Sequence, residues 1–250
     1  MKSQFVTMSM LCLATVAFFS CTRQSLRENR NGIDGEGYDS SHFFTNILKV
    51  DGLKVKESAW GGYYDSEKME RTALLVCLYG DMYTDMSEDT SAEFEKLANA
   101  IGDVPKKKGY RHATPVDNPT TESSISCVSV KTLTGYDEAH PQGSSLKDII
   151  RLKFQSFDYV FDKTLKPTNI EGACNGTYLL KPEEPFTLIK YPALQIGQSQ
   201  GDKFGGDLVM SIEFTQKPIN PSQQIEVTLC FANGLVLSKE VAVQIKEQRE

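Results

Sequence analysis

"QIEVTLCFANGLVLSKEVAVQI", residues 224–245, decides the fold, because apolar side chains recur there at every second position. This is the period of a β-strand with one buried face. The first half places four residues on that face: Ile225, Val227, Leu229 and Phe231. The second half continues with four more: Leu235, Leu237, Val241 and Val243. Between the halves, Asn233-Gly234 predicts a hairpin with a type I′ turn.

Outward from this hairpin, most of the chain keeps the strand pattern. Strands are predicted within five earlier ranges: 48–55, 70–80, 123–133, 149–161 and 177–191. The second range is continuously apolar and should lie in the centre of a sheet. The last range indicates two short strands around a Pro-Glu-Glu-Pro turn. Residues 105–122 are predicted to be a loop.

One helix interrupts the strands. Residues 90–93, Thr-Ser-Ala-Glu, match a capping box. Four apolar residues follow at helical spacing: Phe94, Leu97, Ala98 and Ile101. Gly102 is a typical helix stop. Eight or nine strands, one short helix, long loops and no regular alternation of strands with helices predict a mostly β protein, an antiparallel immunoglobulin-like β-sandwich.

The first twenty residues have the features of a signal peptide. After Lys2, an apolar run without further charge ends at Ser20-Cys21. The run is shorter than the roughly 20 apolar residues of a membrane-spanning helix. We therefore expect cleavage of residues 1–20, a polar tether over residues 21–41, and one sandwich domain over residues 42–250, with 105–122 as the place where it could subdivide. An ordinary secretory peptide with an incidental cysteine is the alternative.

The stretch Phe18-Phe19-Ser20-Cys21 resembles a bacterial lipoprotein signal, with Phe18 where that signal prefers Leu. This loose form is similar to lipoproteins of Bacteroides-type bacteria. Residues 137–148, "DEAHPQGSSLKD", resemble a segment found in a family of uncharacterised lipoproteins from such bacteria. The resemblance implies a lipid on Cys21 that anchors the protein to a membrane, and it implies no activity.

Charge bears on partners and on location. The formal net charge is −6, and nucleic-acid binding, which needs a basic surface, is not expected. No phosphate-binding glycine loop occurs, and no cofactor is expected. The residues after Cys21, "TRQSLRENR", are basic. Surface-exported lipoproteins of this group resemble one another in an acidic run there, so we expect attachment to the outer membrane with the body facing the periplasm.

The cysteines of the predicted domain are Cys77, Cys127, Cys174 and Cys230. Three of them lie in apolar runs, and a free cysteine behaves as a small buried hydrophobe. We favour unpaired strand cysteines. One disulfide, with Cys174 as a candidate partner, is the alternative in an exported protein.

The sequence contains one match to a catalytic motif, but the residues around it do not fit the structure that the motif requires. "GQSQG", residues 197–201, matches a nucleophile elbow, but no helix-forming stretch follows Ser199 and no histidine lies later in the chain. His140 lies beside Pro141 in the "DEAHPQGSSLKD" segment, where a structural loop is the favoured interpretation, with Asp148 as a polar partner of a short turn. No catalytic residue is predicted, and the protein is not expected to be an enzyme.

Two clusters are weaker candidates for binding. Trp60, Tyr63 and Tyr64 flank two glycines in a composition suited to stacking on a sugar or a partner protein, with a buried corner of the sandwich as the alternative. Four carboxylates are candidate calcium ligands: Asp81, Asp85, Glu88 and Asp89. They lack the spacing of a calcium loop and precede a helix, whose dipole favours acids, so no metal is predicted.

Three functions follow as hypotheses. The first is a lipid-anchored, non-enzymatic binding or assembly module of the cell envelope. The second is a glycan-binding lipoprotein of a polysaccharide-uptake system, suggested by the lineage and by Trp60. The third is a hydrolase whose carboxylates are dispersed along the chain.

Overall fold

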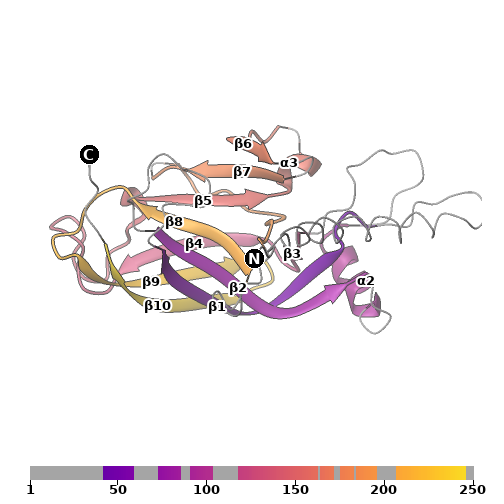
Figure 1. Ribbon diagram of the computed structural model, residues 1–250, viewed down its shortest axis with the longest axis horizontal. Helices are drawn as coiled ribbons and strands as arrows, with labels where there is room; N and C mark the ends of the chain where they lie inside the picture. Colours follow the sequence, from indigo (N-terminus) through magenta and orange to yellow (C-terminus); the bar gives the residue numbers. More distant parts are fainter. Residues whose placement is uncertain are drawn as a thin grey trace, which may run out of the picture.

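The computed structural model describes residues 42–58, 73–85, 91–103, 118–162, 164–171, 175–182, 184–195 and 207–245. These residues form a mostly β protein (Figure 1). They contain ten strands: β1 Asn46–Ser58, β2 Ala73–Thr84, β3 Thr120–Thr121, β4 Ile125–Thr132, β5 Ile150–Ser156, β6 Asn169–Glu171, β7 Asn175–Leu180, β8 Asp207–Phe214, β9 Ser222–Phe231 and β10 Val236–Gln244. They also contain three helical segments: α2 Ser91–Ala100, α3 Asp158–Phe161 and the 3-10 turn η2 Lys147–Ile149.

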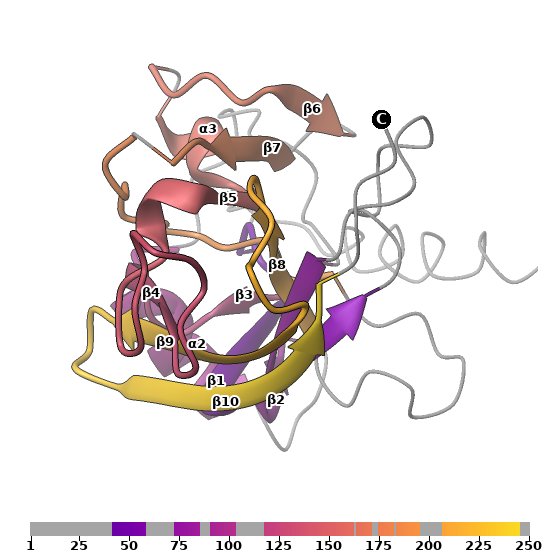
Figure 2. The same cartoon turned by 90° about the vertical axis from the view of Figure 1, so that its left-hand side faces the viewer.

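The strands build two sheets in a β-sandwich-like arrangement. The larger has seven strands in the order β3-β1-β2-β8-β5-β7-β6, and the smaller has the order β10-β9-β4. Strand pairs in both are antiparallel except β1 with β3. The larger sheet curls, so that β1 lies beside β10 (Figure 2). Gln244 at the end of β10 donates its backbone N–H to Glu57 Oε2 of β1 at 3.1 Å. The mostly β class is confirmed, whereas this strand order does not confirm an immunoglobulin-like connectivity.

The C-terminal hairpin has the predicted buried face but a different turn. Ile225, Val227, Leu229 and Phe231 are all buried. Gly234 N–H donates to the Phe231 carbonyl at 3.0 Å, and Phe231 N–H donates to the Leu235 carbonyl at 2.8 Å. These bonds enclose three loop residues, as in a type I turn followed by a bulged glycine. The type I′ prediction is wrong, although Gly234 does adopt a positive φ of 90°.

The main core fills the space between the two sheets. It contains the buried faces of β1, β2, β5 and β8 on one side and of β4 and β9 on the other. Cross-strand partners show the alternation: Leu74 of β2, Ile212 of β8 and Leu152 of β5 are paired in register, and all three belong to this core. Burying each such side chain contributes about 1.5 to 3 kcal/mol before conformational entropy is deducted.

A second, smaller core lies on the opposite face of the large sheet. Here α2 packs on β1 and β2 near one end of the molecule (Figure 1). Phe94 and Ala98 of the helix are fully buried, and Leu97 is nearly so. They pack with Phe44, which precedes β1, and with Ile47 of β1. Gly102, after the helix, has a φ of 81°. The predicted apolar face and stop of the helix are confirmed; Thr90 lies outside the described residues.

The start of the described chain is held by one carboxylate. Asp103, which is 4% exposed, accepts hydrogen bonds from the backbone N–H groups of Phe43 and Phe44, each at 2.9 Å. His42 Nδ1 lies 2.5 Å from the Asp103 carbonyl oxygen, and its Nε2 lies 3.0 Å from Glu95 Oε2. These contacts tie the residues before β1 to α2 and to the turn that follows it.

Three element predictions need correction. The predicted loop 105–122 contains a short strand near its end, β3, and Glu122 just after this strand donates its N–H to the Leu48 carbonyl at 3.0 Å. The strand predicted within 149–161 ends at Ser156. Helix α3 begins at Asp158, whose N–H donates to Ser156 Oγ at 3.0 Å. The second strand expected before residue 191 is a single bridge between Ile189 and Ile125.

The bridge does not extend because a side chain takes the next backbone donors. The Asp158 carboxylate accepts the N–H groups of Lys190 and Tyr191 at 3.0 and 2.6 Å. A ladder cannot use donors that are already bonded elsewhere. Burial raises the pKa of Asp158, although these hydrogen bonds and the Lys190 charge oppose the shift.

The cysteine prediction is also wrong in part. Cys127 of β4 and Cys230 of β9 form a disulfide, with their Cα atoms 4.9 Å apart. The two residues are partners in the register of the neighbouring strands. Cys77 is fully buried in β2, as a small hydrophobe would be. Cys174 lies outside the described residues.

Candidate functional site

Most residues singled out from the sequence as functional lie outside the described ranges. This applies to the lipidation residue Cys21, to the aromatic cluster Trp60, Tyr63 and Tyr64, to Glu88 and Asp89, and to Ser199. Their proposed roles stay predictions. The same holds for the signal peptide and the tether.

Two of the calcium candidates are described. Asp81 is exposed on β2, and Asp85 is half-buried just after that strand. Within the described ranges, no group of three or more His, Cys, Asp or Glu side chains is arranged to hold a metal ion. The structure therefore brings together no ligand set around Asp81 and Asp85 in the part of the chain that it describes.

His140 lies in a cluster with two carboxylates. Its Nδ1 is 2.7 Å from Asp137 Oδ1, and its Nε2 is 3.0 Å from both oxygens of Asp148. The residue is 7% exposed, and the Tyr136 ring packs edge-on against the imidazole. The backbone closes the loop as well, since Tyr136 N–H donates to the His140 carbonyl at 2.8 Å. The segment between β4 and β5 is thus tied to itself through His140.

The electrostatics favour a charged imidazole. Burial alone would lower the pKa of His140, but the hydrogen bonds to Asp137 and Asp148 and their negative charges outweigh burial and raise it. Desolvation alone would raise the pKa of Asp137, but the hydrogen bonds from His140 and Ala139 and the charge of the imidazole together outweigh it and lower the pKa. When both ring nitrogens donate to carboxylates, neither is left to accept a proton from a substrate. The cluster is a structural clamp within this loop; the sequence predicted a loop here but not the contacts of His140 with two carboxylates.

The clamp should make stability depend on pH. A raised folded-state pKa means that His140 stabilises fully below its ordinary pKa of about 6.5, and that this contribution is lost as the pH rises through the higher folded value. The lowered pKa of Asp137 adds a contribution that is lost only as the pH falls below about 4. We expect the melting temperature of His140→Gln to differ most from wild type between these limits.

Thermal unfolding across this pH range measures the effect. Asp148→Asn, which removes one charge facing His140 and keeps the shape, should move the loss of stability to lower pH. A wild-type advantage over His140→Gln that stays constant from about pH 5 to about pH 9 would contradict the clamp.

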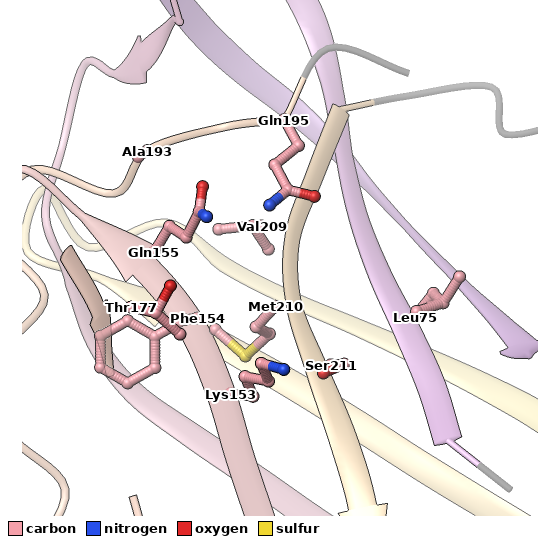
Figure 3. A pocket seen from close by; sticks show the side chains of 10 residues that line it. All are labelled: Leu75, Lys153, Phe154, Gln155, Thr177, Ala193, Gln195, Val209, Met210 and Ser211. Atoms are coloured by element: carbon pink, nitrogen blue, oxygen red, sulfur yellow. The ribbon is translucent and has the colours of Figure 1, made fainter. Parts of the chain in front are cut away.

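A second candidate site is a small cavity beside the large sheet. Figure 3 shows its lining, which comes from β2, β5, β7, β8 and the chain segment 193–195. Five polar side chains line it: Lys153, Gln155, Thr177, Gln195 and Ser211. Five apolar side chains supply the rest of the lining, two of which, Val209 and Met210, also belong to the main core: Leu75, Phe154, Ala193, Val209 and Met210. The volume is about 30 Å³, which is room for one or two waters or for a single polar group of a ligand.

The register explains how these residues meet. Gln155 of β5 pairs with Thr177 of β7, and Lys153 pairs with Ser211 of β8, so the four side chains share one face of the sheet. Ala193 N–H donates to the Gln155 carbonyl at 3.0 Å, which places the segment leading to Gln195 against this face. Sequence reasoning missed the site, because polar residues alternating on a strand usually face solvent.

Comparison with known proteins adds no assignment. No protein-family model, no curated protein and no solved structure matches the chain. Interpretation of the function therefore depends on the residues themselves.

Proposed function

We propose that this protein is a lipid-anchored component of the bacterial cell envelope that acts as a non-enzymatic binding or assembly module. The observation that carries the proposal is the apolar run that ends at Ser20-Cys21. Two or three acyl chains on Cys21 would attach it firmly, since each buried methylene contributes about 0.8 kcal/mol. Among the described residues, no helix is long and apolar enough to span a membrane.

The geometry supports a binding role over catalysis. Both nitrogens of His140 are engaged by carboxylates. The cavity beside Gln155 is far below the roughly 300 to 1,000 Å³ of ordinary small-molecule sites, so it would accept one group of a larger ligand. A rigid sandwich presenting such a surface suits recognition. The basic run after Cys21 favours the outer membrane with the body facing the periplasm.

Cys21→Ser tests the anchor. We expect the variant to carry no lipid label and to move almost completely from the membrane fraction to the soluble fraction, because the modified thiol is gone. Membrane fractionation with metabolic lipid labelling measures both effects. Cys12→Ser is a matched control within the same leader and should stay membrane-bound. Retention of Cys21→Ser on washed membranes would refute the proposed anchor.

Orientation has a separate test. Protease added to intact cells should leave the body uncut if it faces the periplasm. Digestion of the body in intact cells would instead place it on the cell surface.

A glycan-binding role is the second candidate, and the polar cavity favours it. Gln155, Gln195 and Thr177 are neutral hydrogen-bonding side chains that share the lining with apolar ones. Such a set suits a ligand that carries hydroxyl groups on an uncharged frame.

A further inference from the structure

A cluster of aromatic rings lies where the described chain begins. Phe43 is the second described residue, and its ring lies edge-on to Phe161 of α3, with the centroids 5.2 Å apart. Phe161 also packs on Tyr191, with the centroids 4.3 Å apart. Phe44 and Phe157 complete the cluster. The residues that lead into β1 are thus joined to α3 and to the chain before Ala193.

The cluster is buried on one side and open to water on the other. Phe44, Phe157 and Tyr191 are buried, whereas Phe43 is partly exposed and Phe161 is 37% exposed. Covering an exposed apolar ring is favourable. The outer rings therefore offer a surface that an apolar medium can cover.

The neighbours of the exposed rings combine apolar and cationic character. Lys190 is exposed, and its Nζ lies 5.4 Å from the centroid of the Tyr191 ring. Leu188, two residues earlier, is 47% exposed. Asp162, the acid next to Phe161, accepts hydrogen bonds from the N–H and the hydroxyl of Thr164. Protein segments that lie in the interface of a bilayer bind it with the same combination, apolar side chains with lysine beside them.

The place of the cluster along the chain favours a bilayer as the medium that covers it. Residues 22–41 separate Cys21 from His42, the first described residue. Even when fully extended, a chain of this length spans no more than about 70 Å. A lipid on Cys21 would keep Phe43 within that distance of the membrane. A tethered surface has a high effective concentration at the bilayer, so a contact of a few side chains is sufficient.

We propose that Phe43, Phe161 and Leu188 lie in the interface of the bilayer that holds the anchor, with Lys190 facing the lipid phosphates. This inference rests on the proposed lipid anchor and names the surface with which the body contacts the membrane. Figure 1 shows α3 and the connection from β8 to β9 at opposite ends of the molecule. The bilayer contact would turn that connection away from the membrane.

Tryptophan fluorescence can locate the contact. Trp60 is the single tryptophan of the chain, so Trp60→Phe provides a background in which one new tryptophan reports on its own surroundings. In this background, Phe161→Trp and Leu188→Trp place the reporter in the proposed contact. Ile219→Trp is the matched control, because Ile219 is 73% exposed in the connection from β8 to β9.

The experiment uses full-length protein purified from membranes and reconstituted into vesicles of phosphatidylethanolamine and phosphatidylglycerol. Flotation of the vesicles shows whether the protein is anchored, and brominated lipids quench tryptophans that touch the bilayer. We expect Phe161→Trp and Leu188→Trp to lose emission when brominated lipids replace ordinary ones, because both side chains lie in the interface. Ile219→Trp should keep its emission.

Flotation separates failure of the contact from failure of the anchor. Suppose that the protein floats and that either Phe161→Trp or Leu188→Trp, with the melting temperature of its background, is not quenched. This result would reject the bilayer contact, keep the anchor, and leave a partner protein as the occupant of this surface. Equal quenching of Ile219→Trp would also reject the contact, because the body would have no preferred end. Protein that carries no lipid and does not float would reject the anchor and, with it, the contact.

Discussion

Phe231→Ala will lower the free energy of unfolding by about 3 to 5 kcal/mol, as for other buried aromatic residues. Phe231 is 3% exposed at the end of β9 and belongs to the core between the two sheets. Its removal leaves a cavity that the surrounding strands cannot fully close. Urea unfolding of the full-length protein in detergent, followed by fluorescence, measures the change.

Val236→Ala is a suitable control for this variant. Val236 begins β10 next to the same turn but is 58% exposed, so its truncation should change stability by no more than about 0.5 kcal/mol. If Phe231→Ala unfolded at the same urea concentration as Val236→Ala, the buried face of the hairpin would be wrongly placed.

The turn can be tested separately from the packing. Gly234 has a φ of 90°, where a β-branched side chain is strained, so Gly234→Val should cost about 1 to 2 kcal/mol. A Cβ at this position would meet no other atom within 4 Å, so the cost comes from the backbone alone. Gly234→Asn should cost less, because Asn tolerates this conformation. Equal stability of the Val and Asn variants would contradict the assigned turn.

Removal of the disulfide is the second large effect. The bond joins residues that are 103 positions apart, and closing so long a loop in the unfolded chain corresponds to about 2 to 5 kcal/mol. We expect the double variant Cys127→Ala, Cys230→Ala to lose this amount in urea unfolding. Wild-type protein treated with reductant should lose a similar amount, whereas reductant should leave the double variant unchanged.

Two results together would show that the disulfide does not form. The urea unfolding curve of the wild-type protein would be the same with and without reductant, and thiol labelling of protein denatured without reductant would find free thiols at both positions. That outcome would make Cys127 and Cys230 two unpaired, half-buried cysteines in β4 and β9.

The pattern of apolar residues was sufficient to predict a strand or helix whose buried face is set by its own sequence. The alternation in β9 and the apolar face of α2 with Phe94 follow from side-chain period, and both are confirmed. The turn at Gly234 was predicted with the wrong type, because Asn-Gly suits both a two-residue turn and a type I turn with a bulged glycine. Hydrogen bonds to Phe231 decide between them, and they depend on the pairing of the whole hairpin.

Features that depend on which strands are neighbours were not predictable. The disulfide needs β4 beside β9 in a register that brings Cys127 opposite Cys230. The cavity needs Gln155 and Thr177 on paired strands, with Gln195 brought against them by a later segment. None of these residues has a local signal. The expected strand before Tyr191 failed for a similar reason, because the distant Asp158 bonds its backbone.

If the proposed lipid anchor holds the chain at Cys21, the contacts that Asp103 makes with Phe43 and Phe44 have a mechanical consequence. Tension arriving along the chain would reach the described structure first at His42, which contacts the Asp103 carbonyl and Glu95, and next at the bonds from Phe43 and Phe44 to the Asp103 carboxylate. The load then passes to β1, which pairs with β2 along its length except at Asp51, where the register shifts. A pull along the strand axis stresses these ladder bonds in shear, all at once, instead of peeling them apart singly. Drag on the body would thus be borne first by the contacts of His42, Phe43 and Phe44 and then by the ladder between β1 and β2.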